Sequence, residues 1–295
     1  MKYFLGFLIL AFAAPVLLGA YVWTLPVPDQ EPLVDTEFNV KRGAYIARIS
    51  GCVSCHTDEE GGGRPLAGGV ALQTKFGTFF TPNITPDQNS GIGSWSLEDF
   101  ARAVRHGTSP ADEPYYPAFP YPFYASLNDR DVADLWAALQ IVPADPTPSK
   151  PHELNFPYNV RAGLKLWRAW FPSPPKYRNN PKRSISWNRG KLIAQGLAHC
   201  GACHTPRNGA GARMVDRAYA GDPDMLDGGS SPPISPTALR EEGWTRPDIV
   251  KALTTGLTPE GDVFGGSMSE VVRDGTAYLL PMHLDDLATF LLEEE

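Results

Sequence analysis

One five-residue pattern occurs twice in this chain and uses all four of its cysteines. The copies are Cys52–His56 (CVSCH) and Cys200–His204 (CGACH). Two thiols one helical turn apart can form thioether bonds with the two vinyl groups of one porphyrin, and the histidine that follows can bind its iron. The sequence therefore predicts two covalently bound haem c groups. The predicted haem-binding residues are Cys52, Cys55 and His56 for the first haem, and Cys200, Cys203 and His204 for the second.

Other uses of the cysteine pairs fit less well. In a Cys₄ zinc site the two pairs usually lie roughly 15–20 residues apart, whereas here they lie in opposite halves of the chain. A thioredoxin-like pair needs a βαβ context, which neither motif has. Covalent haem is the interpretation that also explains the histidine after each pair.

The N-terminus predicts export. Residues Tyr3–Leu25 carry no charge and follow Lys2. This run is long enough to span a bilayer, which takes roughly 20 apolar residues, and longer than the apolar part of most secretory signals. An uncleaved transmembrane helix over 1–25 is favoured over a removed signal, with a tether over 26–36. In a bacterium the rest of the chain would lie on the periplasmic side of the inner membrane, or free in the periplasm if the segment is cleaved.

An internal repeat surrounds the two motifs and divides the chain. Three pairs of segments correspond: Arg42–Ala47 with Arg189–Ala194, Thr81–Pro86 with Ser231–Pro236, and Trp95–Asp99 with Trp244–Asp248. The last pair predicts a helix opened by a Ser or Thr cap with an acid three residues on, and closed by Gly107 or Gly256. A further apolar stripe at helical spacing ends each half. We predict an all-α fold of two tandem cytochrome c domains with long loops, over 37–140 and 187–295, joined by a bridge over 141–186.

The repeat also locates a sixth iron ligand for the second haem. Met268 lies twelve residues after Gly256, behind small residues that allow a loop to approach the haem. Methionine is a common axial ligand in cytochromes c and raises the reduction potential. Met268 could instead be only a core residue.

The first half has no such methionine, because the residue twelve positions after Gly107 is Phe119. His106, at the end of the preceding helix, is a tentative metal ligand, although it could equally cap helix carbonyls or bind a propionate. An open or water-filled position is the main alternative, and three aromatic residues stay in consideration. These are Tyr115, Tyr116 and Tyr121.

Together these motifs resemble the multi-haem cytochrome c subunits of membrane-bound alcohol, aldehyde and gluconate dehydrogenases. The resemblance covers nearly all of the exported region and is carried by several segments: Phe76–Thr78, Thr81–Pro86, Gly91–Trp95, Tyr116–Tyr121, Asn155–Pro157, Trp187–Gly190 and Cys203–Asn208. The best-known members have three haem domains, and this chain stops after two. They also have methionine where Phe119 stands, so their first-haem ligation does not transfer, whereas Met268 matches their second ligand.

The bridge contains a strongly apolar segment, Tyr158–Phe171, which predicts a helix. Burial between the two domains is favoured, because buried aromatic helices are commoner than exposed ones. The alternative is a docking surface for a dehydrogenase or for the membrane.

The expected function is electron transfer. Such a protein would take electrons from a quinoprotein or flavoprotein dehydrogenase in the periplasm and pass them to a cytochrome, an oxidase or the quinone pool. The sequence has no nucleotide-binding glycine motif and no zinc-protease motif, so the chain is not expected to be the dehydrogenase itself. A di-haem peroxidase or oxidase with an open first haem is the alternative. The net charge of −7 argues against nucleic-acid binding.

Overall fold

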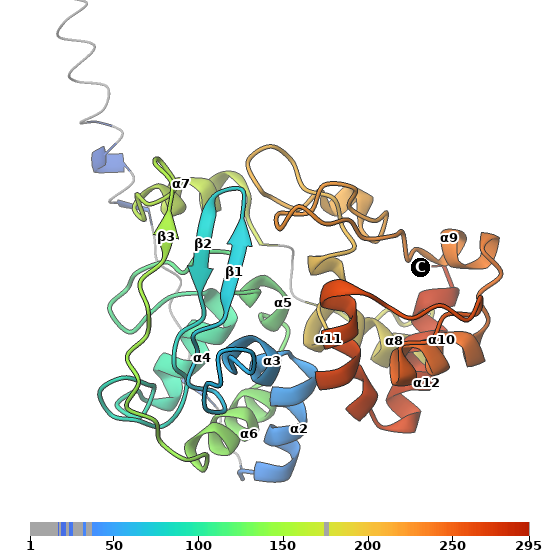
Figure 1. Ribbon diagram of the computed structural model, residues 1–295, viewed down its shortest axis with the longest axis horizontal. Helices are drawn as coiled ribbons and strands as arrows, with labels where there is room; N and C mark the ends of the chain where they lie inside the picture. Colours follow the sequence, from blue (N-terminus) through green and yellow to red (C-terminus); the bar gives the residue numbers. More distant parts are fainter. Residues whose placement is uncertain are drawn as a thin grey trace, which may run out of the picture.

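The computed structural model describes residues 37–173 and 177–294, together with 17, 19–21, 24–25 and 32–33. It is mostly helical, and Figure 1 shows two lobes that correspond to the two halves of the chain. The helices of the first half and the bridge are α2 (Val40–Ile49), α3 (Cys52–His56), α4 (Leu97–His106), α5 (Tyr121–Tyr124), α6 (Asp129–Gln140) and α7 (Gly163–Trp170). Those of the second half are α8 (Ile185–Leu192), α9 (Pro236–Glu241), α10 (Arg246–Thr255), α11 (Gly266–Asp274) and α12 (Pro281–Leu292).

The capping signals predicted the start and end of two helices correctly. Ser96 opens α4 and Thr245 opens α10, each in a capping box with the aspartate three residues on. Gly107 and Gly256 follow these helices in the left-handed conformation, with φ of 60° and 77°. The two halves therefore use the same local structure at corresponding positions.

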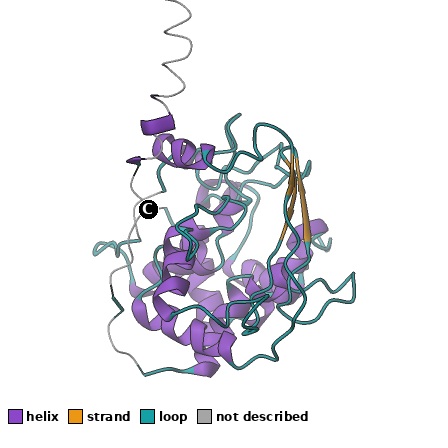
Figure 2. Cartoon of the chain, turned by 90° about the vertical axis from the view of Figure 1, so that its left-hand side faces the viewer, coloured by secondary structure: helices purple, strands orange, loops and turns teal. Residues whose placement is uncertain are grey.

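A small sheet departs from the all-α prediction. Strands β1 (Ala71–Thr74) and β2 (Gly77–Phe80) form an antiparallel hairpin, and β3 (Glu153–Leu154) of the bridge pairs with β2. Figure 2 shows these strands at one edge of the molecule, away from the main group of helices. The strands are too short for a periodic pattern in the sequence, and β3 pairs with a segment far from it along the chain.

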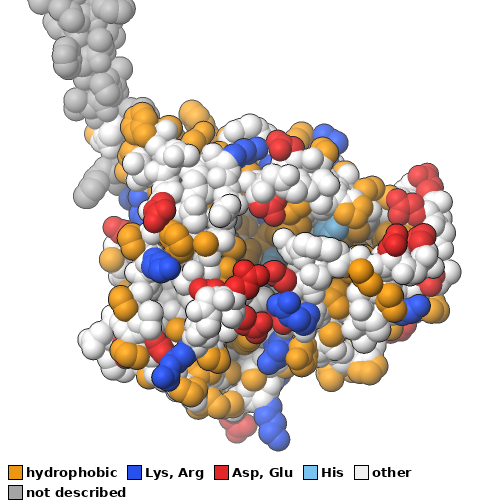
Figure 3. Space-filling view, in the orientation of Figure 1, with side chains coloured by type: hydrophobic (Ala, Val, Ile, Leu, Met, Phe, Trp, Pro, Cys, Tyr) orange, Lys and Arg blue, Asp and Glu red, His pale blue; other side chains and the backbone are white. Residues whose placement is uncertain are grey.

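The two halves contact each other through α2. The Tyr45 hydroxyl lies 2.7 Å from His283 Nδ1, and the Arg48 guanidinium lies 4.1 Å from the ring centre of Tyr278. Ile49 is buried among the apolar residues of the second half. Farther out, Figure 3 shows a hollow in the surface between the two lobes, with apolar and histidine side chains visible inside it.

A close helix crossing repeats in the two halves. At Gly43 in α2, an added Cβ would lie 1.7 Å from the Asp134 carbonyl oxygen in α6. At Gly190 in α8, an added Cβ would lie 2.0 Å from the Asp286 carbonyl oxygen in α12. Only glycine permits these two backbones to approach so closely, which explains the repeated Arg-Gly pair.

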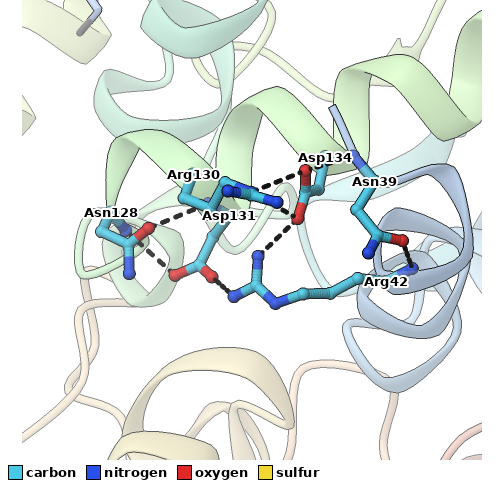
Figure 4. A network of polar contacts seen from close by, with 6 residues as sticks. All are labelled: Asn39, Arg42, Asn128, Arg130, Asp131 and Asp134. Carbon is cyan, nitrogen blue, oxygen red and sulfur yellow. Dashed lines mark hydrogen bonds and ion pairs between the residues drawn. The ribbon is translucent and has the colours of Figure 1, made fainter. Parts of the chain in front are cut away.

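The arginine of each pair bonds the same partner helix. Figure 4 shows Arg42 reaching Asp131 and Asp134 on α6. The buried Asp134 carboxylate also accepts a hydrogen bond from the Asn39 backbone N–H at 2.7 Å, and these partners hold its pKa below the ordinary value despite burial. In the second half, Arg189 lies 2.7 Å from Asp286 in α12. The Arg-Gly repeat thus joins the first and last helices of each half.

The structure of the bridge differs from two predictions, one about the bounds of its helix and one about its burial. The predicted helix over Tyr158–Phe171 begins only at Gly163, and the structure describes no buried residue within α7. The exposed fractions of Tyr158, Val160 and Trp170 are 46%, 50% and 71%. The predicted burial of this segment between the domains is therefore wrong for these residues, which line the open space between the two halves.

The predicted transmembrane segment over 1–25 lies largely outside the described residues. Among the helices that the structure does describe, none combines the length and apolar character needed to cross a membrane.

Candidate functional site

The first motif forms helix α3, which places Cys52 and Cys55 one turn apart and ends at His56. His56 Nδ1 lies 2.7 Å from the carbonyl oxygen of Pro82. A carbonyl oxygen can only accept a hydrogen bond, so Nδ1 carries the proton and Nε2 keeps its lone pair. A fixed tautomer of this kind is what an iron-binding histidine requires.

The second motif repeats this arrangement with a different local fold. Cys200–Ala202 form a 3₁₀ turn, and His204 Nδ1 lies 2.8 Å from the carbonyl oxygen of Pro232. Pro82 and Pro232 occupy corresponding positions in the repeated segments. Sequence reasoning found these segments but missed their role, which is to orient the proximal histidines.

Desolvation keeps the two histidines in the neutral form that can bind iron. It lowers the pKa of His56 and of His204, outweighing the proline hydrogen bonds, so both rings are neutral near pH 7. It also raises the pKa of Cys52 and of Cys200 to about 12, and all four cysteines are free thiols.

A cavity of about 510 Å³ contains the first motif. This is within the usual range of roughly 300–1,000 Å³ for small-molecule and cofactor sites. Apolar side chains from α4 and α6 form much of its wall, including Phe100, Val104 and Leu135. Cys52, Cys55 and His56 all line it, so the structure brings the predicted residues together around a space suited to a flat apolar group.

The loop after α4 and the loop after α10 have the same backbone hydrogen bonds. Tyr115 N–H donates to Gly107 C=O at 2.7 Å, and Phe264 N–H donates to Gly256 C=O at 2.8 Å. Phe119 and Met268, each four residues farther on, therefore occupy corresponding positions in the repeat, although Met268 lies in a helix and Phe119 does not. Phe119 lines the first cavity.

Met268 lies in α11, where the sequence predicted a loop. On this helix Ser267, Glu270 and Asp274 line the space between the two halves. Met268 shares the other face with Val272, one turn later, which is 5% exposed and packs within the second half. Met268 is not among the described residues that line either cavity, and its ligation of the second haem stays a prediction.

The structure distinguishes the other candidate iron ligands of the first haem by whether they line its cavity. Tyr115 and Tyr116 line the first cavity, whereas Tyr121 is buried beside Gly107 and lines only the space between the halves. His106 ends α4 and is absent from the described side chains around either cavity. Its ligation stays a prediction that this placement does not favour.

Between the halves lies a larger cavity of about 1590 Å³, onto which both motifs open. Cys55 and Cys203 both line this cavity. Burial raises the pKa of the Cys55 thiol, and the nearby Cys203 thiol adds to this increase. The attachment points of the two predicted haems therefore face a common space.

His199 stands at this junction, a role that sequence reasoning missed. It directly precedes the second motif, yet its ring centre lies 6.0 Å from that of Phe123 and 5.8 Å from that of Tyr124 in the first half. A Cβ added at Gly51, just before the first motif, would lie 3.4 Å from His199 Cε1. No local pattern signals such a contact.

Comparisons with known proteins agree with this geometry. No protein-family model matches the chain. It is 41% identical over 261 residues to a "Diheme cytochrome c-type" protein of Cereibacter sphaeroides, covering 87% of each chain. It is 35% identical over 275 residues to the gluconate 2-dehydrogenase cytochrome c subunit of Pantoea cypripedii, covering 88% of this chain and 61% of that one. It is 36% identical over 275 residues to the cytochrome c subunit of the quinone alcohol dehydrogenase of Komagataeibacter europaeus, covering 89% and 57%. The chain thus spans less than two thirds of these two dehydrogenase subunits.

Proposed function

Because this chain belongs to the family of dihaem cytochromes c related to dehydrogenase cytochrome c subunits, we propose that it carries electrons from a dehydrogenase to a respiratory acceptor. A haem held at each motif would supply one-electron redox chemistry. The protein attaches each haem at the cysteines, orients the proximal histidine through a proline carbonyl, and excludes water with apolar walls.

The observation that carries this proposal is the common cavity onto which Cys55 and Cys203 open. Haems held by Cys55 and Cys203 would share this space, so an electron accepted in one half could reach the other without leaving the protein. This arrangement suits a carrier that receives electrons at one surface and delivers them at another.

For the partners and location, we propose a quinoprotein or flavoprotein dehydrogenase as donor. A cytochrome, an oxidase or the quinone pool would be the acceptor. The uncharged run Tyr3–Leu25 after Lys2 supports anchoring in a bacterial inner membrane, with the haem domains in the periplasm. Cleavage of that run would give a soluble periplasmic protein instead.

The direct test is substrate-linked respiration in membranes of the source bacterium with and without this gene. Ethanol, gluconate and fructose are added in turn, and oxygen uptake and haem reduction are followed together. We expect uptake with at least one dehydrogenase substrate to fall in the deletion strain and to return with the wild-type chain. A Cys200→Ala, Cys203→Ala chain, which lacks the second attachment site, should not restore it. Unchanged respiration with every substrate that the membranes oxidise would contradict the proposal.

A peroxidase or oxidase is the second candidate, and the observation in its favour is Phe119 at the position of the missing methionine. Cyanide addition to the oxidised protein separates the two functions. Ready binding to a high-spin haem, with peroxide turnover, would favour the enzyme. Two low-spin haems that do not bind cyanide would exclude the peroxidase or oxidase function.

The role of His199 gives a prediction about transfer between the haems. His199→Asn keeps a residue type tolerated at the observed φ of 38° but removes the ring that packs on Phe123 and Tyr124. We expect slower inter-haem transfer, measured by flash photolysis, and a loss of roughly 1–3 kcal/mol of stability. His199→Phe, which keeps a ring, should lie closer to wild type. Equal transfer rates in all three proteins would show that His199 has no positioning role.

A further inference from the structure

One wall of the first haem cavity comes from the bridge and differs from the rest. Most of the cavity is apolar and belongs to the first half, whereas Lys150, His152, Asn159 and Arg161 bring polar groups from the segment between the domains. Among the described residues that line this cavity, none is acidic. The wall therefore presents two cations and further donors to a cavity that no described acidic residue lines.

The bridge is held firmly against the first half at this point. Strand β3 extends the β1–β2 hairpin, and Asn83 N–H donates to Ser149 Oγ at 3.0 Å. Asn83 Nδ2 also donates to the Asp145 and Thr147 carbonyl oxygens at 2.8 and 2.9 Å. Asn83 follows Pro82, the proline that orients His56, so these polar groups are tied to the proximal side of the same site.

The hydrogen bonding of the His152 ring makes its Nε2 a hydrogen-bond donor. Its Nδ1 accepts a hydrogen bond from the Phe80 N–H at 3.2 Å, so the proton of the neutral ring is on Nε2. The ring lies between Phe79 and Tyr116, with centre distances of 5.3 and 5.6 Å. A protonated Nε2 has no lone pair for iron, but it can donate a hydrogen bond to an anion.

Arg161 is aligned by two contacts. Its guanidinium lies 5.2 Å from the ring centre of Tyr116 and 3.4 Å from a carboxylate oxygen of Glu113. The ion pair with Glu113 is largely exposed and therefore weak. Arg161 thus keeps donors that can bind a second carboxylate at the cavity mouth.

We propose that this bridge wall binds the propionates of the first haem, with Arg161 and Lys150 as their counter-ions and His152 and Asn159 as hydrogen-bond donors. A haem brings two carboxylates into an otherwise apolar cavity, and carboxylates so placed require cations and donors. The bridge is then a part of the first haem site as well as a link between domains. This inference rests on the haem-binding part of the proposed function and not on its electron partners.

The charge of these residues should act on the potential of the first haem. Removing a cation near the iron stabilises the ferric state relative to the ferrous state, because the ferric state carries the additional positive charge. Arg161→Gln should shift the ferric/ferrous equilibrium of the first haem about tenfold toward ferric, equivalent to about 59 mV for a one-electron couple. Lys150→Gln, at an exposed position, should shift it in the same direction by a smaller factor.

The experiment is a spectroelectrochemical titration of the holoprotein, with haem content measured in parallel. Arg161→Lys keeps the charge and should retain most of the wild-type potential. Arg168→Gln is the matched control, since Arg168 also stacks on a tyrosine, Tyr121 at 4.7 Å, but is not among the described residues lining the first cavity. The second haem should keep its potential in every variant.

The results separate the possible failures. Unchanged potentials in both Arg161→Gln and Lys150→Gln would overturn the propionate assignment. So would a change in spin state or cyanide affinity without a shift in potential, which would place these groups on the ligand-binding face. A wild-type protein with fewer than two haems would instead contradict the haem-binding part of the proposed function, whatever the variants do.

Discussion

Gly43→Ala should destabilise the first half by roughly 3 kcal/mol or more and prevent normal haem loading at Cys52 and Cys55. The new methyl group would lie 1.7 Å from the Asp134 carbonyl oxygen and 2.9 Å from Ala138 Cβ, so α2 and α6 would have to separate. The same separation would break the Arg42–Asp134 ion pair and open the apolar cluster beneath it. Denaturant unfolding and the number of haems per chain measure the effect.

Two glycines provide the comparison. Gly190→Ala should act in the same way on the second half, since its Cβ would lie 2.0 Å from the Asp286 carbonyl oxygen. Gly163→Ala at the start of α7 meets no described atom within 4 Å and should change stability by less than about 1 kcal/mol. If Gly43→Ala unfolded at the same denaturant concentration as Gly163→Ala, the close crossing would not be the reason for the Arg-Gly repeat.

Exchanging the residues at the two equivalent positions should exchange the character of the two haems. Phe119→Met places a thioether at the position that corresponds to Met268, so the first haem should gain a methionine-to-iron charge-transfer band. Its ferric/ferrous equilibrium should shift roughly a hundredfold toward ferrous, or about 120 mV. Met268→Phe should remove the band from the second haem and lower its potential by a similar amount. Absorption spectra and redox titrations of the two single variants measure both changes.

The double variant and one histidine variant complete this test. Phe119→Met with Met268→Phe should carry one methionine band, now belonging to the first haem. His106→Ala should leave the spectrum unchanged, because His106 lies outside the described walls of both cavities. A band that persists in Met268→Phe would refute Met268 as the ligand, and a new high-spin haem in His106→Ala would restore His106 as a candidate.

The features that could be predicted from the sequence depend on residues close together along the chain. The two haem motifs, the capping boxes at Ser96 and Thr245, and the glycines that end α4 and α10 each act within one or two helical turns. Their effect on the backbone is local and independent of the rest of the fold. Repetition of these local signals was enough to infer two similar halves and to align Phe119 with Met268.

The features that were missed or predicted wrongly depend on contacts between distant segments. Strand β3 pairs with a hairpin more than seventy residues earlier, and α7 lines the space between the two halves without burying any of its residues. The contact between His199 and Tyr124 likewise joins residues of different halves. Such contacts are decided by how whole surfaces fit, which short patterns do not encode.

The sequence by itself predicted which cofactor this protein attaches, at which cysteines and histidines, and a difference between the two sites in their sixth position. It could do so because thioether formation and iron ligation need particular side chains at particular spacings. Only the tertiary structure showed that Pro82 and Pro232 hydrogen-bond the histidines, that Cys55 and Cys203 open on one cavity, and that bridge residues line the first cavity. Those relations arise from the packing of two halves and a connecting segment, and packing is a property of the folded chain as a whole.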